Sequence, residues 1–348
     1  MKLYVNHSIL KKPIISYTND GFFPFLMICE FFKWTFMEGI MGTLNRRDLL
    51  KSIALAGSFT SLCAREIFSE TKKITRNEEN RRMRIPITMC HGIDGFAPVN
   101  PALTIEDFKN YFRIASKMGF ISISYDQLAA WFREEGDLPA KPIMFDFDHS
   151  VKSIRHEIYP VMKELGFKGN LFIYTAQMEE LYAKKLPDFK DRKVMTWDEI
   201  GKLMDAGWHI GAHTHTHLGL SKDVSGEIIR GELIKNDTIL KKELGVLPKD
   251  FAFTGTTWSK TAEKEVMKRY RLGRLWIVDS KYNADGAEIR YADLVGVSGE
   301  DEKDGGPPNA ARYITKESHP YRLPSMEFMN LIYKYDAFQK YLEGALET

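Results

Sequence analysis

The stretch PIMFDFDHSVKS, residues 142–153, places two aspartates and a histidine at the end of an apolar run. Successive side chains of a β-strand point to opposite faces, so Asp146 and Asp148 share one face while the neighbouring phenylalanines take the other. Burying carboxylates is costly unless they are paired or hydrogen-bonded. We therefore interpret the stretch as a strand that ends just before His149. The polar groups at its carboxyl end have either a structural or a catalytic role.

On both sides of this strand, the sequence predicts strands that alternate with helices. The first helix is well signalled, with Thr104 as its N-cap and Gly119 at its end. Strands joined by helices of this length predict βα units and a parallel sheet. Six or more such units favour a closed or nearly closed barrel with its functional site at the carboxyl ends of the strands. The predicted strands are 85–93, 120–124, 142–148, 169–175, 208–214, 250–255 and 274–279, and the predicted helices are 103–120, 125–134, 154–167, 196–207, 225–245 and 261–273.

The overall composition is that of a globular protein. The chain has 348 residues, of which 44% are hydrophobic and 28% charged, and it is long enough for one large α/β domain or two smaller ones. A formal net charge of +2 gives no electrostatic footprint for nucleic acid. The three cysteines lack CxxC spacing, so neither a disulfide framework nor a thiolate metal site is expected.

The first 64 residues are interpreted as an N-terminal extension with an export signal. LNRRDLLKSIALAGSFTSLCA, residues 44–64, has a basic start, a short apolar stretch of small residues, and Ala64 at a cleavage point. Its NRRDLLK segment resembles the twin-arginine signal, which exports folded proteins, so we expect a periplasmic or extracellular protein. An amphipathic helix with a chance arginine pair is the alternative. The apolar stretch within residues 1–40 is shorter than the ~20 residues of a spanning helix, so no stable membrane span is expected in the mature protein.

The remaining chain is predicted to hold one catalytic domain. Residues 65–84 are highly charged with few large apolar side chains and are interpreted as a solvated linker, so the domain should span 85–348. Residues 299–311, GEDEKDGGPPNAA, are dominated by glycine, proline and charge and predict a long loop. That loop either rims the functional site or is a featureless surface insertion.

The stretch HIGAHTHTHLGLS, residues 209–221, contains four of the nine histidines. Imidazole is the commonest neutral protein ligand for zinc and similar metals. In an extended strand, His213, His215 and His217 would share one face and form a three-histidine site by themselves. In a turn that follows a strand, His213 and His217 would converge at i, i+4 while His215 points away. A surface cluster without metal is the remaining interpretation.

The acidic strand and the histidine stretch can end at the same mouth of a barrel. A carboxylate beside a divalent metal can act as a general base that takes a proton from water. Alternatively, carboxylates at strand ends cap neighbouring helices and have no catalytic part.

Several stretches together resemble the polysaccharide deacetylases of carbohydrate esterase family 4, the NodB-homology domain. They are the opening stretch, YPVMKELGFKGNLFIYT (159–175) and GWHIGAHTHTH (207–217), and the likeness runs in the expected order from about residue 85 to 328. The resemblance implies a distorted (β/α) barrel, a bound divalent metal, and hydrolysis of N-acetyl groups from polymers that contain N-acetylglucosamine.

The first motif of that family normally reads Thr-Phe-Asp-Asp-Gly, with the base first and a metal ligand second. Aligned without a gap through the downstream Tyr-Pro pair, the resemblance implies Asp148 as the base and His149 in place of the ligand aspartate. It implies His213 and His217 as the other two ligands. Three histidines and one open position make a competent zinc site, with cobalt or nickel as alternatives. The rival register uses Asp146 as base and Asp148 as ligand but breaks the downstream match.

Two later motifs depart from the family. FAFTGTTW, residues 251–258, stands where a backbone N–H normally helps to hold the oxyanion, a role that the resemblance assigns to Gly255. The late Leu-x-His motif, the usual source of the general acid, is not recognisable, and His319 matches it poorly and reads as a loop histidine. His91 falls where relatives carry a strand-end histidine, and it either lines the pocket or packs.

The sequence therefore predicts an exported, metal-dependent hydrolase that removes N-acetyl groups from an N-acetylglucosamine-containing polysaccharide or oligosaccharide. A degenerate deacetylase that binds glycan without cleaving it is the first alternative, favoured by His149 and by the altered residues 254–256. Hydrolysis of another small C–N amide bond by the same metal chemistry is the second.

Overall fold

The computed structural model describes residues 82–93, 103–183, 194–221, 223–278, 313–328 and 338–347. The predicted N-terminal extension, most of the predicted linker and the predicted loop at 299–311 lie outside these residues. Within the described residues, no helix is long and apolar enough to span a bilayer.

Seven parallel strands of the described chain close into a barrel. The strands pair in the order β1-β3-β4-β5-β6-β7-β8, and β8 pairs with β1 to complete the closure. The short strand β2 adds to β3 outside this ring. The (β/α) barrel predicted from the sequence is thus confirmed. The strands are β1 (Ile87–Cys90), β2 (Ile121–Ser122), β3 (Pro142–Asp148), β4 (Asn170–Ile173), β5 (His209–Ala212), β6 (Asp250–Ala252), β7 (Leu272–Val278) and β8 (Leu323–Glu327).

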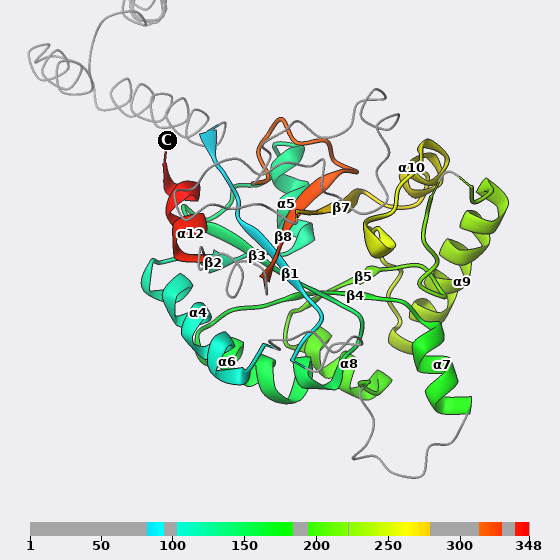
Figure 1. Ribbon diagram of the computed structural model, residues 1–348, viewed down its shortest axis with the longest axis horizontal. Helices are drawn as coiled ribbons and strands as arrows, with labels where there is room; N and C mark the ends of the chain where they lie inside the picture. The colour runs from blue at the N-terminus through cyan, green and yellow to red at the C-terminus, as the bar shows by residue number, and fades with distance from the viewer. Residues whose placement is uncertain are drawn as a thin grey trace, which may run out of the picture. The chain divides into compact units, whose positions relative to one another are not determined.

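Helices follow most strands and surround the barrel, as Figure 1 shows for α4, α6, α7, α8 and α9. Thr104 caps the first described helix and exchanges two hydrogen bonds with Asp107, as the sequence predicts. The helix predicted at 154–167 begins instead as a π-turn. Pro160 has no N–H, and it stands in the first turn of the α-helix Tyr159–Glu164, where a missing donor is tolerated. The helices are α4 (Ile105–Lys117), α5 (Tyr125–Phe132), η1 (Ile154–Ile158), α6 (Tyr159–Glu164), α7 (Ala176–Ala183), α8 (Trp197–Asp205), α9 (Gly226–Leu244), η3 (Thr254–Thr256), α10 (Lys260–Met267) and α12 (Phe338–Leu346).

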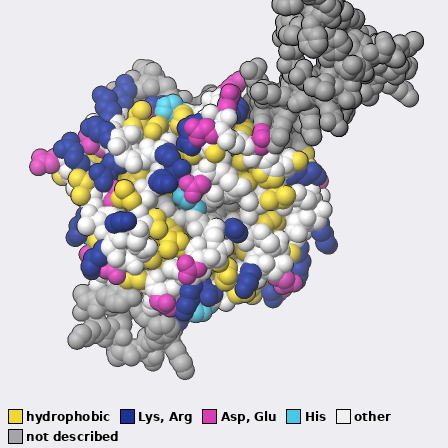
Figure 2. Space-filling view, turned by 180° about the vertical axis from the view of Figure 1, so that it is seen from behind, with side chains coloured by type: hydrophobic (Ala, Val, Ile, Leu, Met, Phe, Trp, Pro, Cys, Tyr) yellow, Lys and Arg dark blue, Asp and Glu magenta, His cyan; other side chains and the backbone are white. Residues whose placement is uncertain are grey.

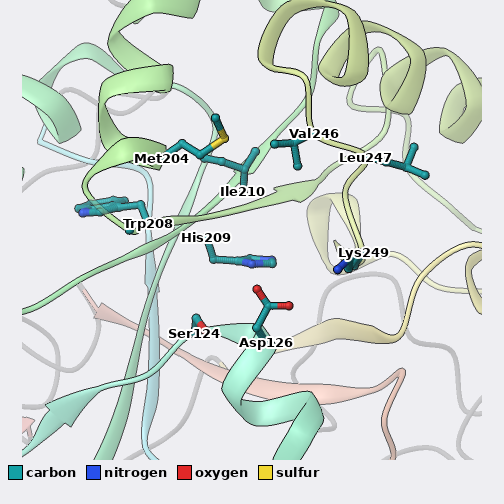
Figure 3. Close-up of a pocket in the computed structure, with 10 residues that line it drawn as sticks. Ser124, Asp126, Met204, Trp208, His209, Ile210, Val246, Leu247 and Lys249 are labelled. Carbon is teal, nitrogen blue, oxygen red and sulfur yellow. The ribbon is translucent and has the colours of Figure 1, made fainter.

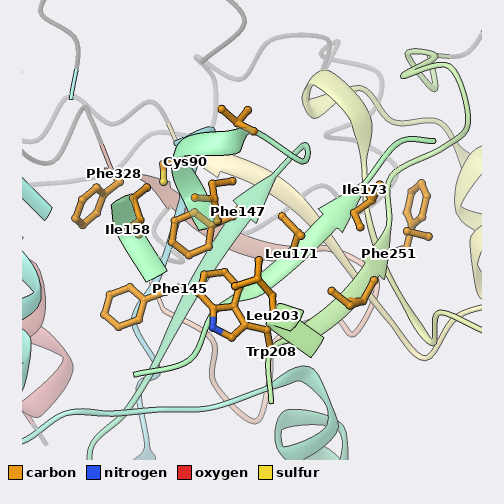
Figure 4. Packing of buried hydrophobic residues seen from close by; sticks show 14 of the residues in the cluster. Cys90, Phe145, Phe147, Ile158, Leu171, Ile173, Leu203, Trp208, Phe251 and Phe328 are labelled. Carbon is orange, nitrogen blue, oxygen red and sulfur yellow. The ribbon is translucent and has the colours of Figure 1, made fainter. Parts of the chain in front are cut away.

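The two faces of β3 serve different layers. Phe145 and Phe147 point outward into the larger hydrophobic cluster, where Phe147 stacks on Trp208 (Figure 4). Met144 belongs to a second cluster that fills the barrel interior and includes residues of α5. The alternation predicted from the sequence therefore sends the aspartates of β3 into the barrel.

A cavity of about 320 Å³ lies at the opposite end of the barrel, where the strands begin. Figure 3 shows His209 at its centre, with Asp126 and Lys249 beside the ring and aliphatic side chains on the far wall. Burial lowers the pKa of His209 to about 4, so this imidazole is neutral. The cavity is separate from the carboxyl ends of the strands, where a barrel carries its catalytic groups.

Charged side chains are mixed on the face of the molecule shown in Figure 2. Lysines and arginines lie among acidic side chains there and do not gather into one basic patch. This face therefore lacks the single-sign surface by which proteins bind nucleic acid.

Replacing Phe145 should test the outer packing layer. The Phe145 ring is buried and contacts the rings of Phe112 and Phe167 at centroid distances of 4.9 and 5.2 Å. Phe145→Ala should lower the free energy of unfolding by about 3–5 kcal/mol, because the cavity cannot fully collapse. Urea unfolding measures this change. Ile121→Ala, at an exposed position, is the control, and equal losses in both variants would contradict the assignment.

Candidate active site

Three histidines converge at the carboxyl ends of β3 and β5. His149 directly follows β3, His213 directly follows β5, and His217 lies four residues further along the same turn. One ring nitrogen of each lies within 4.8 Å of the other two. The structure thus brings together the three residues that the sequence analysis named as ligands.

The donor set fits a divalent metal ion. Two nitrogen ligands of a tetrahedral zinc ion lie roughly 3.4 Å apart, so the three imidazoles need only a small approach to share one ion. Burial lowers the pKa of His213 to about 3, and it also lowers the pKa values of His149 and His217. Neutral imidazole is the form that binds metal, so the burial of the cluster favours coordination.

The backbone selects the binding nitrogen of His213. Its Nδ1 lies 2.8 Å from the carbonyl oxygen of Ala252. A carbonyl only accepts hydrogen bonds, so Nδ1 carries the hydrogen and Nε2 remains to accept a metal.

The histidine stretch forms a turn, not an extended strand. β5 ends at Ala212, and the His215 ring is turned away from the other two, with Nδ1 2.9 Å from Thr175 Oγ1. Thr214 and His217 have left-handed backbone with φ of 59° and 61°, and His149 has φ of 68°. Each such conformation costs on the order of 1–3 kcal/mol and persists only where its surroundings enforce it. The second of the two geometries considered from the sequence is therefore the one observed.

Asp148 lies beside the histidines and is paired with a buried arginine. Arg274 on β7 donates a hydrogen bond from Nη2 to Asp148 Oδ1. Burial by itself would raise the pKa of Asp148, but the Arg274 guanidinium holds that pKa well below its ordinary value. Asp148 is thus a carboxylate at neutral pH.

Asp146 lies deeper in the barrel. It accepts hydrogen bonds from Tyr125 Oη at 2.6 Å and from Asn170 Nδ2 at 3.0 Å, and Arg274 Nε is 3.2 Å from its Oδ2. Burial raises the pKa of Asp146 to about 7, although Arg274 and the two hydrogen bonds oppose this shift. The geometry places Asp148 rather than Asp146 next to the histidines, and the choice between Asp148 and Asp146 as base stays a prediction.

Gly255 lies in the turn η3 after β6. Its backbone is left-handed with φ of 58°, and its neighbour Thr254 donates a hydrogen bond to the carbonyl oxygen of Leu218, just past the last cluster histidine. Leu220 N in turn donates to Thr257 Oγ1 at 2.5 Å. The fold therefore holds the Gly255 turn against the histidine turn, and the oxyanion role of Gly255 stays a prediction.

Sequence reasoning missed Arg274 and left His91 without a role. The signal for Arg274 was a charged residue at the head of the apolar run 274–279, whose side chain is 1% exposed in the structure. The ring of His91 lies 4.7 Å from that of His149, at the edge of the cluster. His319 lies exposed in the loop before β8 and is not brought to the site.

Comparisons with known proteins agree with this architecture. Residues 135–272 match the family model of the polysaccharide deacetylases. The structure of IcaB from Ammonifex degensii is similar with a TM-score of 0.55 at 12% identity, over 76% of this chain and 98% of that one. The BpsB deacetylase domain from Bordetella bronchiseptica gives a TM-score of 0.51 at 12% identity, over 71% and 97%. No curated protein gave a significant sequence match.

Residues 135–272, less than half of the chain, are thus similar to the polysaccharide deacetylases, a family of hydrolases. The solved structures, at 12% identity, support the shared fold alone.

Metal content of variants tests the three-histidine site. His213→Ala and His217→Ala should each lose stoichiometric zinc, because two remaining histidines hold the ion far more weakly. His215→Gln is the matched control, since that side chain points to Thr175 and should leave the zinc content unchanged. Atomic absorption after dialysis measures the bound metal. Zinc loss in His215→Gln equal to that in His217→Ala would contradict the observed geometry.

The pH dependence of stability tests Asp146. Its folded-state pKa of about 7 exceeds the ordinary value of 3.8, so the folded protein takes up a proton in this range that the unfolded chain does not. The contribution of Asp146 to the free energy of unfolding should therefore increase as the pH falls from about 7 to 3.8. Asp146→Asn should remove this contribution, measured by urea unfolding at several pH values. The exposed variant Asp205→Asn should keep the wild-type profile, and an unchanged profile in Asp146→Asn would contradict the shift.

Proposed function

We propose that the protein is a metal-dependent hydrolase that removes N-acetyl groups from a polysaccharide or oligosaccharide containing N-acetylglucosamine. One observation carries this proposal: three neutral histidines, two of them buried and His217 partly buried, converge beside an ionised carboxylate at the mouth of a barrel that matches the deacetylase family model. Acetamide hydrolysis needs an activated water, a base and an electrophilic partner for the carbonyl oxygen. The first two requirements have candidates within this cluster.

His149, His213 and His217 would hold the ion. When bound, a divalent metal supplies a Lewis acid that polarises the acetamide carbonyl and lowers the pKa of water to about 7. A set of three imidazoles, without the aspartate usual in this family, favours nitrogen-preferring ions, with zinc first and cobalt or nickel as alternatives.

Asp148 would accept the proton of the attacking water. Because Arg274 stabilises its carboxylate, Asp148 is a weak base, and it could not compete for a proton of bulk water. Asp148 could take a proton only from water whose pKa a bound metal had lowered. The proposed base would therefore depend on the proposed metal. Gly255, in the turn held against the histidines, would donate its N–H to the developing oxyanion.

We also propose that the protein is exported by the twin-arginine route to the periplasm or the cell exterior. The support is the NRRDLLK segment at residues 45–51, followed by a short apolar stretch of small residues. A glycan substrate outside the cytoplasm is compatible with this destination.

A second candidate function is glycan binding without cleavage. Two observations favour it: Thr254, Gly255 and Thr256 replace the residues usual in the third motif, and the late histidine of the family is not recognisable in the sequence. Such a protein would bind chitooligosaccharides and release no acetate from them.

Acetate release from chitooligosaccharides or peptidoglycan fragments tests the proposed base. Asp148→Asn in zinc-loaded protein should lower kcat by about 10²–10⁴-fold, because the amide cannot take a proton from water. Zinc content should stay unchanged, since Asp148 is outside the ligand set. Undiminished turnover would exclude Asp148 as the base. Binding of these glycans by wild type without acetate release would instead establish the second candidate.

A further inference from the structure

The turn that holds two of the three histidines is strained. Thr214 and His217 both have left-handed backbone, with φ of 59° and 61°. A β-branched residue such as threonine is a genuine outlier at positive φ. The Thr214 side chain is also fully buried, and its hydroxyl makes no hydrogen bond. The turn therefore needs an external restraint to keep His213 and His217 facing each other.

Glu232 on helix α9 accepts three hydrogen bonds from the middle of this turn. Its Oε2 accepts from the backbone N–H of His215 at 2.9 Å and from that of Thr216 at 2.7 Å. Its Oε1 accepts from the Thr216 hydroxyl at 3.0 Å. Hydrogen bonds to a carboxylate are stronger than neutral ones, and these fall between the two left-handed residues.

A second polar residue on the same face of α9 restrains the neighbouring strand. Asn236 lies one helical turn beyond Glu232, so both side chains point the same way. Its Oδ1 accepts from Thr175 N at 3.1 Å, and its Nδ2 donates to Ile173 O at 3.2 Å. Thr175 in turn contacts the His215 ring at 2.9 Å. One face of α9 thus ties the end of β4 to the histidine turn.

We propose that Glu232 is a positioning residue of the metal centre. It does not reach the metal itself, since both of its oxygens are directed to the turn. It holds the backbone of residues 215 and 216 so that His213 and His217 present their nitrogens together. This inference rests on the proposed metal-dependent function.

Zinc affinity of the full chain, measured by competition with a chromophoric chelator, tests the proposal. Glu232→Ala should weaken zinc binding by about 10–100-fold, the usual effect of losing a group that orients metal ligands. Glu232→Gln should keep most of the affinity, because its amide oxygen can accept both backbone N–H groups. Glu243→Ala removes another acid of α9, one that pairs with Lys242, and should bind zinc as wild type does.

A double variant separates positioning from general stability. Glycine adopts the left-handed conformation without steric cost. In a Thr214→Gly background the turn needs less restraint, so adding Glu232→Ala should weaken zinc binding by a smaller factor than it does in wild type. A role confined to overall stability would show equal factors in the two backgrounds. Thermal unfolding of the metal-free variants shows whether each is folded. If Glu232→Ala does not fold, the zinc affinity of Glu232→Gln still tests the proposal.

The outcomes distinguish this inference from the function on which it rests. Wild-type protein that binds no zinc would reject the metal-dependent function and the positioning role with it. Zinc bound equally by wild type and by Glu232→Ala would reject the positioning role alone. A loss of affinity in Glu232→Ala, retained binding in Glu232→Gln and a smaller loss in the Thr214→Gly background would establish it.

Discussion

A buried guanidinium between two carboxylates is the interaction on which the interior of this barrel depends. Phe145 and Phe147 pack on the outer face of the barrel, so Asp146 and Asp148 on the same strand must point into the barrel, where water cannot solvate them. Leaving one buried charge without its partner costs roughly 3–5 kcal/mol. Arg274 on β7 contacts both acids and is itself 1% exposed. The outer packing of β3 is therefore compatible with its inner face only because another strand brings this arginine.

The same interaction reconciles two opposed electrostatic demands at the mouth of the barrel. The proposed metal ligands must be neutral imidazoles, whereas the proposed proton acceptor must be an ionised carboxylate, and the two lie side by side. Burial meets the first demand, because it lowers the pKa values of His149, His213 and His217. Arg274 meets the second, because it outweighs the effect of burial on Asp148. One low-dielectric environment thus produces two protonation states.

The histidine turn was only partly predictable from the local sequence pattern. The predicted strand at 208–214 is shorter in the structure, since the left-handed backbone at Thr214 cannot continue a strand that ends at Ala212. Sequence spacing left two geometries open for the histidines, and the conformation of this one residue decides between them. Helix α9 then belongs to the site, because Glu232 holds the turn from outside.

The sequence by itself determined the alternation of strands and helices, the two faces of β3, and the candidate metal ligands His213 and His217. The first two features follow from side-chain periods and cap residues that act within a few positions of each other. The candidate ligands follow from the spacing of the histidines and from the family resemblance. Only the tertiary structure decided that Arg274 pairs with Asp148, 126 positions away. The physical reason is closure of the barrel, which brings distant strands together in a register that no local pattern encodes.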